Sequence, residues 1–344
     1  MISLATLNFE VTTKCNLSCI HCLRDKLVSR HLEKGLVEKV LKQIEGYGIN
    51  RVGFTGGEPL VHPEFMDIIE MAVRMGNKVA FVTNGIRLPQ YVDFLARPEI
   101  KDSVDRISIS IDGVSEASND KIRGKGSFKK ALKGLLACES RGLPFAIKFT
   151  LNALNYKELE AITLMASKLG ARQLQFSHLY PTPDNIRSGL LLEPGQWQSI
   201  QDEHERLKNI VRIPLVFSSV IQLNDRLPIC MALAMMEYYV DSRGWLCLCC
   251  MLPGVSGRKA GEKEKDRLAD LHTTSFVDAH RKLIELIKKL RLKSIKRIES
   301  GKVSRLEHYF CLHCAFQLGK LDWLSEYHDS TWAKMFDQAR GEKR

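Results

Sequence analysis

The sequence predicts an α/β protein whose larger part is a partial (β/α)6 barrel of the TIM type, followed by a small C-terminal domain. Two observations indicate the barrel. Short runs rich in Val, Ile and Phe alternate with helical patterns over the first 180 residues. These runs are apolar on both faces, as strands of a covered parallel sheet must be. A third observation separates the domains, because the alternation fades near residue 215 and cysteines then return.

The predicted strands and helices follow one another in regular order. The strands are expected at 4–11, 51–55, 78–83, 105–111, 145–151 and 172–179. The helices are expected near 33–46, 64–75, 88–96, 127–141 and 156–169. Right-handed crossovers would make the strands parallel, so the loops after the strands would face one common site.

The remaining chain is expected to form a second unit. A turn-rich stretch (180–195) and a helix (196–211) end the first domain, which we place at 1–215. The second domain is then 216–344, with a basic helical insertion near 256–307.

Charge and hydropathy limit the possible partners. The net charge is +11, and much of it lies in 282–305, where Leu and Ile recur at helical spacing. This segment is either an amphipathic helix with a solvated basic face or a binding surface for an anion, and nucleic acid is not the expected partner. The first ten residues lack a signal-peptide pattern, and no run of about 18 apolar residues predicts a membrane span. We therefore expect a cytoplasmic protein.

Nine of the ten cysteines fall into three groups, namely 15/19/22, 230/247/249/250 and 311/314. Clustered cysteines in a cytoplasmic protein more often bind metal than form disulfides. Cys138 stands alone in a helical pattern and is interpreted as a small buried hydrophobic residue.

The first group stands as C-x3-C-x2-C directly after the first predicted strand. Three thiolates on a 4Fe–4S cluster leave one iron without a protein ligand, and that iron can chelate the amino and carboxylate groups of S-adenosylmethionine (SAM). The alternative is zinc, which needs a fourth ligand, and His21 could supply it.

Further motifs follow the next strands in order: FTGGEPL (54–60), FVTNG (81–85), SISIDG (108–113) and KIRGKGSF (121–128). Together with the cysteine motif they resemble the radical SAM superfamily over residues 4–180. The resemblance implies that Cys15, Cys19 and Cys22 hold a 4Fe–4S cluster. His21 is a mild departure, because an aromatic residue often stands there.

The resemblance also implies the residues that contact SAM. Gly56, Gly57 and Glu58 would bind its amino group, since glycine admits close backbone approach and a carboxylate pairs with ammonium. Ser110 would contact the methionyl or ribose part, and Arg123 the carboxylate. The other predicted cofactor contacts are Asn84, Asp112, Asn152 and Tyr180, the last two near ribose and adenine.

The later cysteines are similar to the SPASM/twitch subfamilies, in which C-x(9–15)-G-x4-C precedes a C-x2-C. The resemblance assigns Cys230, Cys249, Cys311 and Cys314 to a second, auxiliary 4Fe–4S cluster in a one-cluster, twitch-like domain. Either Cys247 or Cys250 could replace Cys249. If 244–250 is a strand, alternation excludes Cys250 more firmly than Cys247. A structural zinc site is the alternative.

The family implies reductive cleavage of SAM to a 5′-deoxyadenosyl radical, which abstracts a substrate hydrogen. The substrate is expected to be a ribosomally made peptide, with oxidation helped by the auxiliary cluster. A small anionic, sugar, cyclitol or tetrapyrrole-type substrate is the alternative, and an electron-transfer or iron–sulfur scaffold protein is a third reading. A flavodoxin- or ferredoxin-type donor is expected. Because Cys15 lies close to the N-terminus, a peptide substrate would also need a separate recognition protein.

Overall fold

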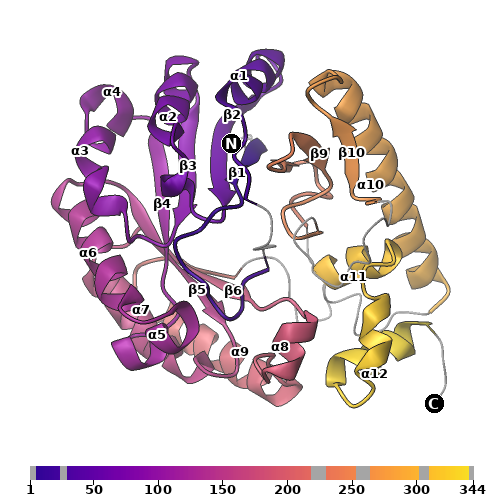
Figure 1. The fold of residues 1–344 in the computed structure, drawn as a ribbon. Coiled ribbons are helices and arrows are strands. Elements are labelled where there is room, and N and C mark those ends of the chain that lie inside the picture. The colour runs from indigo at the N-terminus through magenta and orange to yellow at the C-terminus, as the bar shows by residue number, and fades with distance from the viewer. Residues whose placement is uncertain (1–4, 24–28, 218–229, 253–263, 302–309, 341–344) are drawn as a thin grey trace.

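A computed structural model describes residues 5–23, 29–217, 230–252, 264–301 and 310–340 of the chain. Its centre is a ten-stranded sheet with the order β10-β9-β8-β1-β2-β3-β4-β5-β6-β7. The helices between the first strands lie on the outside of the curved sheet (Figure 1). This arrangement confirms the predicted partial barrel.

The first seven strands run parallel, each paired with the next. They are β1 (Ala5–Thr12), β2 (Ile49–Gly56), β3 (Lys78–Thr83), β4 (Val104–Ser110), β5 (Phe145–Leu151), β6 (Leu174–His178) and β7 (Leu215–Phe217). The first six match the predicted strands to within three residues. The seventh was not predicted, because three residues are too short for a visible alternation.

The helices of this half are α1 (Lys34–Gln43), α2 (Phe65–Arg74), α3 (Val92–Leu95), α4 (Pro98–Lys101), α5 (Glu116–Arg123), α6 (Ser127–Ser140), α7 (Leu159–Lys168), α8 (Pro183–Arg187) and α9 (Pro194–Lys208). Helices α4, α5 and α8 were not predicted, since α4 has only four residues, α5 is mostly polar and α8 lies in the turn-rich stretch. Phe9, Phe54, Phe65 and Phe81 form a chain of ring contacts between the sheet and α2. Cys138 is fully buried in α6, as expected of a small core residue.

The C-terminal part extends the same sheet. It contains β8 (Glu237–Val240), β9 (Trp245–Cys247), β10 (Arg267–Asp270), α10 (Phe276–Glu299), α11 (Phe310–Gln317) and α12 (Thr331–Arg340). Strand β8 lies parallel to β1, with Thr6 opposite Glu237, and β9 and β10 follow antiparallel. The domain boundary near 215 stays a prediction.

Helix α10 occupies the middle of the predicted basic insertion. Its buried residues, Phe276, Ala279, Leu283, Ile287 and Leu290, recur at helical spacing, and the intervening Lys and Arg side chains are mostly exposed. Helix α10 is therefore amphipathic with an exposed basic face, and binding of an anion to that face stays a prediction. Residues 253–263 and 302–309 of the insertion lie outside the described residues. No helix in the described ranges is long and apolar enough to cross a membrane.

Candidate functional site

The first cysteine group lies on the loop that follows β1, at the end of the sheet where parallel strands present their loops. The Cys22 amide donates to the Cys19 carbonyl at 3.3 Å. Cys15 and Cys22 are exposed, whereas Cys19 is buried. Burial raises the pKa of Cys19 to about 11, with Arg123 opposing it and the Cys22 and Cys15 thiols adding to it. The three thiols therefore lie within electrostatic range of one another.

Gly56 and Gly57 bring the loop after β2 against the cysteine loop. A Cβ at Gly56 would meet the Thr12 carbonyl at 2.1 Å, and one at Gly57 would meet the Lys14 carbonyl at 2.2 Å. Backbone bonds join the two loops, from Gly57 N–H to Thr12 O and from Glu58 N–H to Lys14 O. In this structure the close approach that needs glycine is therefore to the cysteine loop itself.

The Glu58 carboxylate is fully buried and joins the ends of β2 and β3. Its Oε1 accepts from the Thr83 hydroxyl at 2.6 Å and the Leu60 amide at 3.1 Å, and its Oε2 accepts from the Asn84 amide at 2.6 Å. A carboxylate has about four acceptor sites, so roughly one remains for a ligand. Burial raises the pKa of Glu58, although these donors lower it. The predicted pairing with the SAM ammonium stays a prediction.

Asn84 connects the β3 loop to the cysteine loop. Its side-chain nitrogen Nδ2 donates to Asn16 Oδ1 at 2.7 Å and lies 3.9 Å from the Cys15 sulfur. The structure therefore brings Asn84 to the predicted cluster ligand. Asn16 has no motif signal in the sequence and was not predicted.

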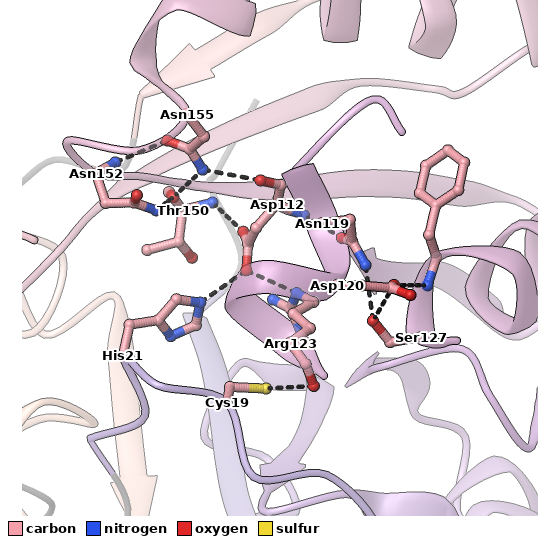
Figure 2. Close-up of polar contacts among 11 residues, drawn as sticks. Cys19, His21, Asp112, Asn119, Asp120, Arg123, Ser127, Thr150, Asn152 and Asn155 are labelled. Atoms are coloured by element: carbon pink, nitrogen blue, oxygen red, sulfur yellow. Dashed lines mark hydrogen bonds and ion pairs between the residues drawn. The ribbon is translucent and has the colours of Figure 1, made fainter. Parts of the chain in front are cut away.

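Asp112 lies at the centre of a buried polar network at the end of β4 (Figure 2). Its Oδ2 lies 2.6 Å from Arg123 Nε and 2.7 Å from His21 Nε2. Its Oδ1 accepts from the Thr150 amide at 2.7 Å. Arg123, which was predicted to pair with the SAM carboxylate, thus already pairs with Asp112 and keeps further N–H donors of its guanidinium.

Charge pairing sets the ionisation of this network. Burial alone would raise the pKa of Asp112, but Arg123 and His21 lower it to about 2. The network also reaches the cysteine loop twice, through the His21 ring and through the Arg123 carbonyl, 4.0 Å from the Cys19 sulfur. Sequence reasoning gave His21 no role beyond a possible zinc ligand, because its partner lies 91 residues away.

The other predicted SAM contacts lie at different depths. Ser110 is buried at the end of β4, opposite Lys148 of β5. The Asn152 side chain is used within its own turn, donating to the Thr150 carbonyl and accepting from the Leu154 amide. Tyr180 is fully buried, and the charged groups that most affect it are Cys311, Cys249 and Cys314. Tyr180 therefore lies within electrostatic range of the second cysteine set, and its predicted contact with SAM stays a prediction.

The second set comes together from three segments. The pKa of Cys311 is raised well above its usual value by burial and then by Cys249, Cys230, Cys314 and Cys250. Lys320, just after α11, pairs with Asp266 and donates to the Leu252 carbonyl at 2.9 Å. These contacts hold the Cys249 segment against α11. Cys230, Cys249 and Cys314 therefore lie within electrostatic range of Cys311, and their assignment to an auxiliary cluster stays a prediction.

The strand argument about the spare cysteines is wrong. Strand β9 ends at Cys247, so side-chain alternation does not continue to Cys250. Cys250 lies within electrostatic range of Cys249 and Cys311, whereas the largest charged influences on Cys247 are Asp241 and Asp266. Cys250, not Cys247, is the spare thiol beside the second set.

Both thiol sets have the donor chemistry of an iron–sulfur cluster. No three Cys, His, Asp or Glu side chains within the described ranges converge as a single metal ion requires. A cubane cluster spaces its thiolates more widely, because each ligates a different iron. In the first set only three thiols are present, which suits a cluster with one open iron. In the second set five thiols are near one another, which suits full ligation.

Comparison with known proteins gives the family. The model described as "Radical SAM superfamily" matches residues 9–166. Mycofactocin maturase MftC of Mycobacterium tuberculosis (strain CDC 1551 / Oshkosh) is 31% identical over 57% of this chain and 50% of its own length. AdoMet-dependent heme synthase of Methanosarcina barkeri is 30% identical over 51% of this chain and 50% of its own. The chain thus spans about half the length of the curated relatives it matches.

The solved structure of native anSMEcpe with bound AdoMet has a TM-score of 0.64 at 16% identity, covering 97% of this chain and 99% of that one. The same protein with AdoMet and Kp18Cys peptide gives a TM-score of 0.63 at 17% identity and covers 82% of each chain. The likeness in fold therefore extends from the barrel into the C-terminal part. With the cysteine loop, the GGE turn and the Asp112 network all at the strand ends, the match shows that residues 9–166 of the chain form a domain of the radical SAM superfamily.

Proposed function

We propose that this chain reductively cleaves SAM and uses the resulting 5′-deoxyadenosyl radical to modify a peptide oxidatively. The observation that carries the proposal is the loop of Cys15, Cys19 and Cys22, fixed at the strand ends by the GGE turn and by the His21–Asp112–Arg123 network. A 4Fe–4S cluster on these thiolates would supply the electron that breaks the sulfonium bond.

The protein's own residues would position SAM and exclude water. Arg123 offers its remaining guanidinium donors to the SAM carboxylate, while Asp112 keeps the guanidinium charged and oriented. Ser110 and Asn84 present polar groups at the ends of neighbouring strands. Burial of Glu58, Asp112 and Arg123 keeps this region dry, which a radical reaction requires.

The space between the two cysteine sets suits the substrate. Ile147 and Phe149 of β5 face the outer core, so Lys148 between them faces the inside of the barrel. Burial lowers the pKa of Lys148, with Cys250 and Glu237 opposing and Arg106 and Arg123 adding to the effect. Its ammonium has no hydrogen bond or ion pair in the described part of the chain. Lys148 is therefore an unpaired cation between the sites, available to a substrate carbonyl or carboxylate.

A neighbouring cavity of about 630 Å³ offers room for a longer substrate. It is lined by Ala153, directly after Asn152, by Leu191 and by Trp332 and Tyr327 of the C-terminal part. This volume lies within the usual range of ligand sites. Together with the peptide-bound anSMEcpe of similar fold, it supports a peptide substrate.

A small carboxylate-bearing molecule is the second candidate. The similarity to a heme synthase and the unpaired Lys148 both favour it. A flavodoxin- or ferredoxin-type donor, and for a peptide a separate recognition protein, complete the proposal.

The test is anaerobic reconstitution of the full chain followed by iron, sulfide and product analysis. We expect about eight irons and eight sulfides, and slow release of 5′-deoxyadenosine with dithionite. The triple variant with Ala at positions 15, 19 and 22 should keep about four of each and release none. Cys138→Ala is the matched control, because it removes a buried thiol outside both sets and should change neither. Release of 5′-deoxyadenosine by the triple variant would refute the proposal.

A further inference from the structure

Tyr180 carries a buried hydroxyl that the proposed SAM chemistry does not use. The residue follows β6 and has no solvent exposure. Its backbone carbonyl accepts from the Asn185 side chain at 3.0 Å, which fixes the loop. Its hydroxyl, however, has no hydrogen-bond partner among the residues that the structure describes. A buried hydroxyl without a partner is costly, so a partner absent from the protein atoms is expected.

The surroundings of the hydroxyl identify that partner. Burial raises the pKa of Tyr180 well above its usual value, and the next largest influences are Cys311, Cys249 and Cys314, then Asp266. Coulomb interactions of this kind weaken with distance, so the phenol lies within electrostatic range of three thiols of the second set, although none of them is close enough to accept its hydrogen bond directly. Asp266 is already paired with Lys320. The thiolates and sulfides of a cluster are therefore the acceptors that remain for the phenol.

We infer that the Tyr180 hydroxyl donates a hydrogen bond to the sulfur atoms of the auxiliary cluster and raises its reduction potential. The inference rests on the proposed second cluster. Hydrogen bonds to cluster sulfurs stabilise the reduced, more negative state, and they are among the main determinants of cluster potential. A higher potential makes the auxiliary cluster a better acceptor for the electron that an oxidised substrate radical must lose.

Backbone groups contribute to the same environment. Leu252 and Met251 amides bond to Cys249, and Leu233 and Ala232 amides bond to Cys230. Tyr180 differs from them because a single substitution removes its donor and leaves the backbone unchanged. Tyr180 belongs to the loop after β6, so through its side chain the barrel would contribute to the environment of the second cysteine set.

The experiment is an EPR-monitored redox titration of Tyr180→Phe in the background that lacks the first three cysteines, so that one cluster gives the signal. The midpoint potential should move to a more negative value, with iron content unchanged. Tyr238→Phe is the matched control. Its hydroxyl lies 3.4 Å from the His280 ring on α10, and its loss should leave the potential unchanged.

Two outcomes separate the inference from the function on which it rests. An intact cluster with the wild-type potential in Tyr180→Phe overturns the Tyr180 assignment alone, whereas a wild-type chain with only one cluster overturns the second cluster as well. If Tyr180→Phe loses iron, 3-fluorotyrosine at position 180 gives an independent readout. Its more acidic hydroxyl is a stronger donor and should raise the potential, and an unchanged potential overturns the inference.

Discussion

Replacing Asp112 with Asn should destabilise the protein before any cofactor is bound. The Asp112 side chain has no solvent exposure, and it pairs with Arg123 at 2.6 Å. Asn keeps the shape but leaves the buried guanidinium without its counter-charge. Breaking a buried pair in this way costs about 3–5 kcal/mol.

The pKa of Asp112 gives a second, pH-dependent estimate of how much its ion pair stabilises the fold. The pKa of Asp112 falls from its ordinary value of 3.8 to about 2 in the folded protein. At about 1.4 kcal/mol for each pKa unit, this corresponds to about 2–3 kcal/mol of stability. Because the folded pKa is the lower one, this stability is present above pH 3.8 and is lost as the pH falls toward 2. Between pH 5 and pH 3 the difference between wild type and variant should narrow by about 1 kcal/mol.

The assay is urea unfolding of the cofactor-free chain followed by circular dichroism at several pH values. Asp105→Asn is the matched control, because Asp105 lies on β4, just before Asp112 in the chain, and pairs with Arg51 at 3.4 Å in a partly exposed ion pair. Such surface pairs contribute about 0–1 kcal/mol, so this variant should unfold almost like wild type. Equal stability of Asp112→Asn and Asp105→Asn, or a difference that does not change with pH, would show that the network is not held by charge.

The remaining predictions concern the glycine turn, the substrate space and the second cysteine set. Gly57→Ala places a Cβ 2.2 Å from a carbonyl of the cysteine loop, so it should lower the free energy of unfolding by about 1–3 kcal/mol and lower the iron content of the first cluster. The control Gly35→Ala meets nothing within 4 Å and should change neither. Equal melting temperatures and iron contents of the two variants would contradict this prediction. Lys148→Met should release 5′-deoxyadenosine without substrate like wild type but lose about 10–100-fold in product formation by mass spectrometry, and full product yield would contradict its role. Cys247→Ala should keep the iron of the second cluster, and Cys249→Ala should lose it. Iron loss in both variants would contradict the conclusion that Cys247 lies outside the second set.

The sequence was sufficient for the barrel and insufficient for its continuation. Strands β1 to β6 are buried on both faces, so each one is a long apolar run that can be recognised in the sequence. Strands β8 to β10 have only three or four residues each, and β8 contains Glu237, so no periodicity announces them. The place of β8 beside β1 depends on pairing across more than 230 residues, which no local pattern encodes.

The site was predictable as a set of residues but less so as a set of roles. The motifs correctly bring Glu58, Asn84, Asp112 and Arg123 to one end of the sheet. They do not reveal that the carboxylate oxygens of Glu58 and Asp112 already accept several hydrogen bonds or ion pairs from other protein groups. Such bonds depend on which loops become neighbours after folding, and that also explains why Tyr180 lies within electrostatic range of the second cysteine set.

The pairing of β1 with β8 has a consequence for how the chain folds. Strand β1 leads directly into the first cysteine loop, yet one of its two neighbours is formed by Glu237–Val240. During synthesis this strand therefore keeps an open hydrogen-bonding edge until two thirds of the chain has emerged. Open edges invite pairing with other chains, and contacts so distant in sequence form slowly. Production at low temperature or with chaperones should accordingly improve the soluble yield.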